Sequence, residues 1–240
     1  MKYKDSAVAA AAKGVPDVLN TRTHQILFAA DHHAYHANII KYSNRPFEVG
    51  DWMGMNETIR DAHNAIADSA SRVIFLGDFC YPSKTLIKQI PDLEDVVADF
   101  VKTFKGHIYY SEGNHETFFR RVDIPWTRIP QLFELQIRDP EFEDGKKLLA
   151  CTHYGGRVWN RSHKGTWQLY GHSHGGLKND FGDKLQDWEH ATSMDVGIDT
   201  NNMKPYTWDD VKAHLKTKTF RPVDHHSAAM DLSSREEGDN

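Results

Sequence analysis

The sequence LYGHSHGG, residues 169–176, places two histidines one residue apart in a stretch rich in glycine. In an extended segment alternate side chains point to the same face, so His172 and His174 could reach one point in space. Two imidazoles need further ligands at that point to make a useful site. The rest of the chain must therefore supply such ligands.

The composition is that of a globular chain of 240 residues, enough for one sizeable α/β domain or two small ones. Hydrophobic residues make up 39% and charged residues 26%, which is typical of soluble proteins. The net charge is −5, and the last twenty residues hold five acidic residues against two arginines. Because no basic stripe is visible, we do not expect extended nucleic acid as a partner, and a small nucleotide stays open as an alternative.

The number of cysteines and the hydropathy of the chain indicate in which cellular compartment the protein is expected. The two cysteines, Cys80 and Cys151, form no disulfide framework, so we expect a reducing, cytoplasmic location. The longest small apolar run, residues 7–12, is too short to cross a membrane, and no secretory signal is visible. We therefore expect no membrane partner, and the sequence does not predict the oligomeric state.

The pattern of apolar residues predicts strands that alternate with helices early in the chain and mostly strands later. Such an order favours a mixed α/β sheet layered with helices. Strands are predicted at 25–30, 72–77, 107–111, 132–137, 147–152, 166–171 and 191–198, and helices at 55–70, 92–104 and 207–216, the last with Thr207 as N-cap. We expect an N-terminal extension over 1–23, one domain over 24–219, and a disordered acidic tail over 220–240.

Residues of types that bind metal ions follow five of the predicted strands directly. Open α/β sheets bind their ligands at this place, the carboxyl ends of the strands. In chain order these residues are Asp31, His33, Asp78, Asn114, His153, His172 and His174. Seven ligands are too many for a single ion that also holds a water, so we expect two divalent ions that share one carboxylate. Two ions about 3.5–4 Å apart suit an in-line phosphoryl displacement. Imidazole and carboxylate ligands favour manganese, iron, zinc or nickel, and we expect manganese foremost, with magnesium as a further alternative.

These blocks, in their order along the chain, resemble those of the calcineurin-like metallophosphoesterase family. The blocks are DHH (31–33), GDF (77–79), GNHE (113–116), TH (152–153) and GHSHG (171–175). The segments HANIIKYSNRPF (36–47) and MDVGID (194–199) are similar to those of the small single-domain bacterial and phage members. The resemblance implies a four-layer α/β sandwich with two mixed β-sheets flanked by helices.

The resemblance also implies a role for each residue of the blocks. Asp31, His33, Asp78 and His174 would hold one ion, and Asp78, Asn114, His153 and His172 the other. His115 would face the substrate and protonate the leaving oxygen or stabilise phosphoryl charge, and Glu116 would orient His115. Asp195 and Asp199 lie outside the blocks and follow a predicted strand, and we expect them to form hydrogen bonds to the ligands or a turn, rather than bind metal.

Substrate-binding candidates lie outside the blocks. His36 is expected near the phosphate, with a helix-start histidine as the alternative. Arg45 could bind phosphate through its guanidinium, or form a surface salt bridge. The loop 157–165 carries Arg157, Arg161 and His163 near tryptophans and could bind a nucleotide, although a solvated loop is the alternative.

The function implied is metal-dependent hydrolysis of phosphomonoesters or phosphodiesters by an activated water, on small nucleotide-like substrates. Two alternatives remain open: a catalytically silent scaffold with this fold, and a nuclease acting on DNA or RNA. Amidohydrolases and metallo-β-lactamases also use two metals, but they begin with a His-x-His motif near their first strand. In this chain the first block is Asp-x-His, and His-x-His comes late.

Overall fold

Three short apolar segments form the centre of the fold as parallel strands. They are β2 (Ile26–Ala29), β3 (Arg72–Leu76) and β4 (His107–Ser111), in a sheet of order β10-β2-β3-β4-β5. The other two strands of this sheet are β5 (Thr127–Ile129), which is parallel to β4, and β10 (Tyr206–Thr207), which is antiparallel to β2. This computed structural model describes residues 14, 16, 18–22, 24–179 and 181–221.

A second mixed sheet has the order β1-β6-β7-β8-β9. Its strands are β1 (Val18–Asn20), β6 (Leu132–Arg138), β7 (Lys146–Thr152), β8 (Trp167–Tyr170) and β9 (Ser193–Asp195). Strands β6 and β7 are antiparallel, whereas β7, β8 and β9 run parallel to one another. Strand β1, which pairs with β6, lies in the segment expected to be an extension.

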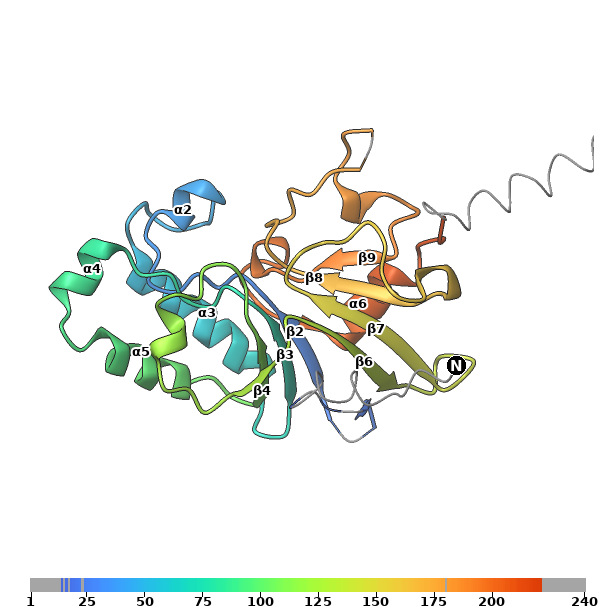
Figure 1. Cartoon of the computed structure of the whole chain (residues 1–240), viewed down its shortest axis with the longest axis horizontal. Helices are drawn as coiled ribbons and strands as arrows, with labels where there is room; N and C mark the ends of the chain where they lie inside the picture. Colours follow the sequence, from blue (N-terminus) through green and yellow to red (C-terminus); the bar gives the residue numbers. More distant parts are fainter. Residues whose placement is uncertain (1–13, 15, 17, 23, 180, 222–240) are drawn as a thin grey trace, which may run out of the picture.

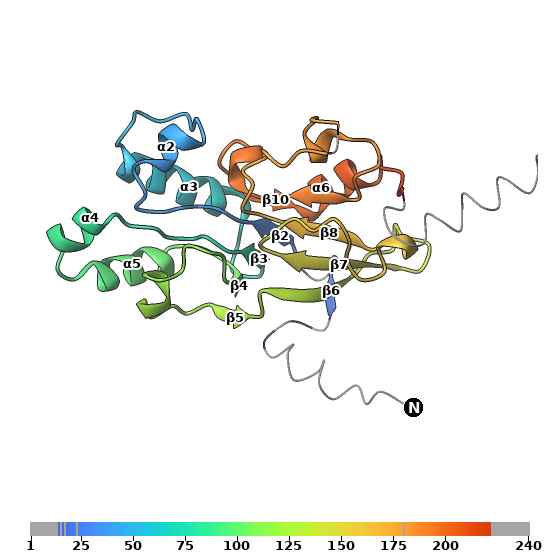
Figure 2. The same ribbon diagram turned by 45° about the horizontal axis from the view of Figure 1, so that its top comes forward.

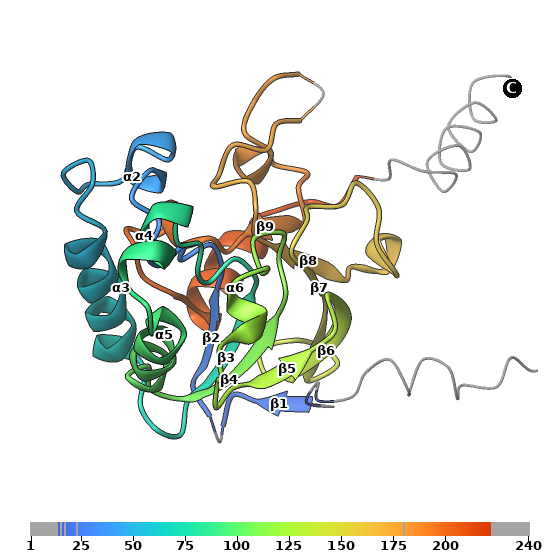
Figure 3. The ribbon, with the colours of Figure 1, turned by 60° about the vertical axis from the view of Figure 1, so that its left-hand side comes forward.

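Most of the described helices lie on one side of this pair of sheets (Figure 1). The helices are α2 (Ile39–Tyr42), α3 (Trp52–Ile66), α4 (Lys84–Gln89), α5 (Leu93–Lys102) and α6 (Trp208–Leu215). Figure 1 shows α2 to α5 gathered on one side of the molecule, with α6 among the strands of the other half. Figure 3 shows the order of the layers, from α3 and α5 through β2 to β4 and on to β6 and β7. The prediction of two mixed sheets flanked by helices is therefore confirmed.

Alternating side chains of β2 divide the core in two. Phe28 faces the second sheet and belongs to a cluster with Leu135 and Leu169. Leu27 faces the helices and packs in the cluster that includes Met55 of α3 and Val97 of α5. This alternation, which follows from the two-residue period of a strand, fixes which face of the sheet meets which layer.

Helix α6 is held at the place where the two sheets meet. Thr207 caps it as predicted, since its side chain accepts from Asp210 N while the Asp210 carboxylate accepts from Thr207 N. Trp208 Nε1 donates to Asp139 Oδ2 at 2.6 Å, and Lys212 Nζ lies 3.0 Å from the same oxygen. Figure 2 shows α6 and β10 beside β2 and β8.

The carboxyl ends of both sets of parallel strands meet at one edge. An isolated parallel bridge pairs Ala30, just after β2, with Gly197, just after β9. The loops that follow β2, β3, β4, β7 and β8 therefore emerge together. No helix within the described ranges is long and apolar enough to cross a membrane. Residues 222–240, most of the expected disordered tail, lie outside the described residues.

Candidate metal centre

The structure brings the predicted metal ligands together in two neighbouring groups. Within each group the candidate ligand atoms all lie within 4.8 Å of one another. The first group comprises Asp31, His33 and His174, and the second comprises Asp78, His153 and His172. Each group collects residues from loops that follow different strands, as the strand-end pattern predicted.

One carboxylate oxygen lies between the two groups. Asp78 Oδ2 is 3.7 Å from His33 Nε2 and 3.4 Å from His153 Nε2. Asn114 Oδ1 is 3.0 Å from the same His153 nitrogen. His153 Nδ1 donates to the carbonyl of Leu76 at 2.7 Å, which leaves Nε2 as the nitrogen that faces Asp78. Asp78 thus has the position required of a carboxylate shared by two ions.

The donor set fits divalent cations. Asp31 Oδ1 and both ring nitrogens of His33 are buried and have no hydrogen-bond partner among the described residues. Burial raises the pKa of Asp31 well above its ordinary value, and the carboxylates of Asp195 and Asp78 raise it further. A bound cation would satisfy the unpaired atoms and favour the ionised carboxylate.

The loops that carry the ligands have an uncommon backbone conformation. Asp31, His33, Asp78, His172 and His174 all have positive φ, between 48° and 68°. Few non-glycine residues adopt such angles, and they cluster at functional sites where the surrounding structure holds them. Five of the seven predicted ligands share this feature. The loops therefore hold these side chains in position at the cost of backbone strain.

Two glycines of the motifs are required by close packing. Gly77 has φ +92°, and a Cβ there would lie 2.7 Å from His153 Nδ1. A Cβ on Gly113 would overlap Asp78 Oδ1. Any larger residue at these positions would therefore displace a predicted ligand.

Arg45 lies inside the protein, which contradicts its expected place in the substrate site. Its side chain is fully buried and forms two hydrogen bonds of 2.8 Å to the Asp199 carboxylate. It also donates to the carbonyls of Asp31 and His32 at 2.6 and 2.7 Å. Since these contacts leave it no access to a substrate, Arg45 instead joins the loop after β2 to the segment after β9.

Asp199 completes a chain of contacts from Arg45 to a predicted ligand. His174 Nδ1 lies 2.6 Å from Asp199 Oδ2. Burial alone would raise the pKa of Asp199, but the hydrogen bonds from His174 and Arg45 hold it below the ordinary value. The carboxylate is therefore ionised and accepts the Nδ1 proton of His174, which turns Nε2 toward the first group. The expected supporting role of Asp199 agrees with this geometry.

Replacing Asp199 by Asn should weaken metal binding by about 10–100-fold, the usual cost of losing such a support. The asparagine side chain would place an NH₂ group where the Arg45 guanidinium or His174 Nδ1 now finds an acceptor oxygen. The His174 ring would then be held less firmly. Mn²⁺ titration calorimetry measures the effect, and thermal unfolding without metal reports whether the fold persists. The matched control is Asp61→Asn, which removes an exposed carboxylate that is paired with Arg60. Equal Mn²⁺ affinities in the two variants would contradict this role.

Asp195 supports the loop of the two histidines. Its buried carboxylate accepts from Ser173 Oγ at 2.7 Å, from Gly175 N at 2.8 Å and from Gly197 N at 2.8 Å. In the same loop, His172 N donates to Asp31 Oδ2 at 2.8 Å, which leaves Asp31 Oδ1 free to face an ion. These contacts hold the loop in its left-handed conformation.

His115 stands at the open side of the site. Its side chain is 36% exposed, and Nε2 is 4.0 Å from Asp78 Oδ2. The ring of Tyr81 packs edge-on against it, with centroids 4.3 Å apart, and also lies 5.0 Å from the ring of His36. On another side Tyr154 lies 4.7 Å from the ring of His172. The two tyrosines, which sequence reasoning did not assign to the site, are partly exposed neighbours of predicted site residues.

Glu116 does not orient the His115 side chain, so that part of the expectation is wrong. Its buried Oε1 accepts from Asp78 N at 2.7 Å and from Gly113 N at 3.1 Å. Glu116 thereby joins the loop after β3 to the loop after β4. His115 is held through its backbone instead, because His115 N donates to Asp78 Oδ1 at 2.8 Å.

The basic loop after His153 is split between two places. Arg157 lies beside Gly155 and Gly156, close in the chain to His153. Arg161 instead lines a hollow with Lys146 at the start of β7, and His163 lies in the adjoining turn η2 (Ser162–Lys164). The predicted ligand lies past the other end of β7, roughly 20 Å away at about 3.3 Å per residue. The structure therefore does not bring Arg161 and His163 to the metal ligands.

The sequence and the fold are similar to those of known proteins. A family model described as calcineurin-like phosphoesterase matches residues 24–230. The chain is similar to the uncharacterized protein MJ1445 of Methanocaldococcus jannaschii, with 27% identity over 204 residues that cover 83% of this chain and 96% of that protein. It is also similar to the crystal structure of AQ665, a protein of unknown function from Aquifex aeolicus. That likeness has a TM-score of 0.56 and 17% identity, covers 79% of this chain and 98% of the other, and shows the fold alone.

Proposed function

Since this chain belongs to the calcineurin-like phosphoesterase family, we propose that it hydrolyses small phosphoesters with the help of two divalent ions, manganese foremost. The observation that carries the proposal is the position of Asp78 Oδ2 within 4 Å of an imidazole nitrogen from each ligand group. A carboxylate in that position can bind two ions at once. A site with a single ion would need no such arrangement.

The ligands divide between the ions as follows. Asp31, His33 and His174 would hold one ion, His153, His172 and Asn114 the other, and Asp78 would bind both. When bound, the ions supply an activated water and neutralise charge on the phosphoryl oxygens. The chain adds the rigid positioning, because Asp199, Asp195 and Glu116 fix the loops and the ring of His174.

His115 is the group that we assign to the leaving oxygen. It is a partly exposed histidine beside Asp78 that belongs to neither ligand group, and its backbone is tied to Asp78. In this position it can donate a proton to the oxygen that leaves, or stabilise its charge. His36 lies next to it on the rim, and burial followed by the nearby His115 lowers its pKa to about 4. At neutral pH His36 would therefore meet a phosphate as an uncharged hydrogen-bond donor.

The surface charges favour small substrates over nucleic acid. Several exposed arginines are paired with carboxylates: Arg120 and Arg128 with Glu112, and Arg121 with Glu94. Binding of long nucleic acid depends on many basic contacts to phosphates, which such neutralised arginines supply poorly. We therefore propose nucleotide-like monoesters or small diesters as substrates.

A substrate panel with added Mn²⁺ tests this function. It should include nitrophenyl esters, nucleoside monophosphates, cyclic nucleotides, and short DNA and RNA. We expect Mn²⁺-dependent turnover of small esters that chelation abolishes and that Mn²⁺ restores. Turnover of nucleic acid alone would favour a nuclease. Two bound ions without turnover of any ester would favour a silent scaffold.

A further inference from the structure

Hydrogen bonds do not fix the orientation of the His115 imidazole. The backbone of His115 is tied to Asp78, but His115 Nε2 lies 4.0 Å from Asp78 Oδ2, which is too far for a hydrogen bond. No hydrogen bond from another described residue reaches the ring, and the carboxylate of Glu116 bonds elsewhere. Because the side chain is also 36% exposed, the ring can turn about its side-chain torsions unless packing holds it.

Packing against Tyr81 is the shortest ring contact of this imidazole among the described residues. The centroids of the two rings are 4.3 Å apart and their planes meet at 63°, an edge-to-face arrangement. The ring of His33 is more distant, with centroids 5.4 Å apart. Aromatic rings in an edge-to-face arrangement attract each other beyond the area that they bury. The ring of Tyr81 therefore limits the directions in which the His115 imidazole can turn.

The backbone of Tyr81 is itself firmly placed. Tyr81 N donates to the carbonyl of Ala34 at 3.0 Å, and a parallel bridge pairs Ala34 with Cys80. The next residue is Pro82, which restricts the backbone of the residue before it. The ring of Tyr81 also meets the ring of His36, with centroids 5.0 Å apart. Tyr81 can therefore act as a rigid support, although the residue is 39% exposed.

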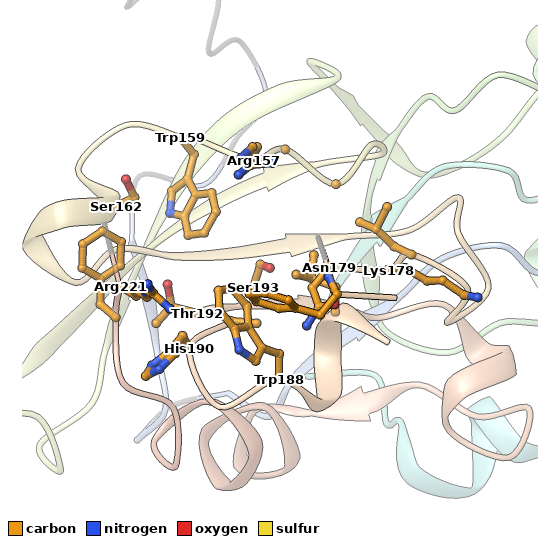
Figure 4. A pocket seen from close by; sticks show the side chains of 17 residues that line it. Arg157, Trp159, Ser162, Lys178, Asn179, Trp188, His190, Thr192, Ser193 and Arg221 are labelled. Carbon is orange, nitrogen blue, oxygen red and sulfur yellow. The ribbon is translucent and has the colours of Figure 1, made fainter. Parts of the chain in front are cut away.

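A large aromatic side chain elsewhere on the molecule has no such relation to His115. Trp188 lines a pocket together with Arg157 and Phe181, and Figure 4 shows its place in the wall. The ring of Trp188 contacts the rings of Phe181 and His190, with centroids 6.5 and 5.3 Å apart. Neither of these residues is assigned to the metal centre. Trp188 therefore offers a control for the loss of an aromatic side chain.

We propose that Tyr81 is a positioning residue for His115: its ring holds the imidazole with Nε2 on the side of Asp78, where the leaving oxygen of the substrate would lie. The inference rests on the proposed function and adds to it a residue that acts on the reaction through His115. An imidazole that turns freely spends less time in the productive orientation. Loss of the Tyr81 ring should therefore slow the reaction and leave substrate affinity unchanged.

NMR relaxation on the full chain loaded with Zn²⁺, which is diamagnetic, tests the support without relying on turnover. The order parameter of the His115 Cε1–H bond, assigned by comparison with His115→Asn, should be about 0.85 in the wild type, the value of rigid groups. It should fall below about 0.6 in Tyr81→Ala and stay high in Tyr81→Phe, which keeps the ring. Trp188→Ala is the control and should leave it unchanged. An order parameter that Tyr81→Ala does not lower overturns the proposal.

Steady-state kinetics with Mn²⁺ test whether the support matters for the reaction. Tyr81→Ala should lower kcat roughly 10-fold with KM and metal content unchanged, a loss between that of a single ring contact and the roughly 10²-fold that a misplaced catalytic group can cost. Tyr81→Phe should keep most of the activity. A Tyr81→Phe variant as impaired as Tyr81→Ala would assign the effect to the hydroxyl and overturn the proposal.

A double-mutant cycle with His115→Asn tests whether Tyr81 acts through His115. Without the imidazole Tyr81 has nothing to position, so adding Tyr81→Ala to His115→Asn should cause no further loss. Tyr154→Ala is the matched control, because Tyr154 packs against the ring of His172 at 4.7 Å, and any loss that it causes should persist in the His115→Asn background. A full additional loss from Tyr81→Ala in that background overturns the proposal.

The two kinds of measurement separate this inference from the proposed function. If the order parameters change as expected while the wild type hydrolyses no ester, Tyr81 still holds the imidazole and the proposed function fails. If the wild type hydrolyses esters while the two losses in the cycle are additive, the proposed function stands and the role of Tyr81 fails.

Discussion

An Asp78→Asn variant should lose at least about 10²-fold of the phosphoesterase activity and a large part of its bound metal. The reason is that Asp78 Oδ2 lies between the two ligand groups, 3.7 Å from His33 Nε2 and 3.4 Å from His153 Nε2. An amide has one oxygen, carries no charge and cannot serve two cations equally. Losses of 10–100-fold are usual for residues that only support ligands, so a shared ligand should cost more.

Metal analysis and steady-state kinetics on the same preparation measure both effects. Asp99→Asn is the matched control, because it removes an exposed carboxylate that pairs only with Lys102. We expect that control to keep two ions and full activity. An active Asp78→Asn protein with two tightly bound ions would show that Asp78 does not bridge them.

A His115→Asn variant should lose about 10²–10⁴-fold in kcat while keeping its metal, which is the range expected for loss of a general acid. The side chain of His115 is partly exposed and is not a member of either ligand group. Its backbone bond to Asp78 Oδ1 does not depend on the imidazole, so the metal site should persist. The control for loss of a histidine is His107→Asn, because His107 is the exposed first residue of strand β4.

The dependence on the leaving group separates the possible roles of His115. If it protonates the leaving oxygen, the loss should shrink for nitrophenyl esters, whose leaving groups need no proton. An equal loss across all esters would assign it instead to charge stabilisation or positioning. Loss of metal from this variant would contradict its placement outside the ligand set.

Much of the site could be predicted because the ligands follow directly after buried strands. Strand β3 carries the apolar run VIFL, which is consistent with a buried strand, and Gly77-Asp78 follows it at once. Since parallel strands place their carboxyl ends at one edge, the residues that follow them had to meet. The same logic holds for β2 and β4 of this sheet. Strands β7 and β8 belong to the second sheet, so their loops meet the others because the two sheets pack with these ends together, as the Ala30–Gly197 bridge shows.

The connections that support the ligands could not be predicted in this way. Arg45 and Asp199 are 154 residues apart, and the charge of an arginine gives no sign of whether it is buried or meets a substrate. Glu116 follows His115 in the chain, but its side chain turns toward the backbone of Asp78 and Gly113 instead. Both errors arose where a side chain bonds to a residue far away in the chain, Asp199 for Arg45 and Asp78 for Glu116, which local sequence does not encode.

The substrate loop shows a second limit. Arg157, Arg161 and His163 lie within seven residues, but the loop returns from the end of β7 to the start of β8 along the length of the sheet. Nearness in sequence therefore did not mean nearness to the metals. The pocket beside Arg157 depends on Trp188 and Phe181 from a later loop, which carried no motif.

Crystals of the full chain soaked with Mn²⁺, and diffraction measured at the manganese absorption edge, test the central claim most directly. We predict two anomalous peaks about 3.5–4 Å apart, with an Asp78 carboxylate oxygen bound to both. One peak should contact Asp31, His33 and His174, and the other His153, His172 and Asn114. A single peak at full occupancy, or two peaks with Asp78 bound to only one of them, would contradict the binuclear centre proposed for this protein.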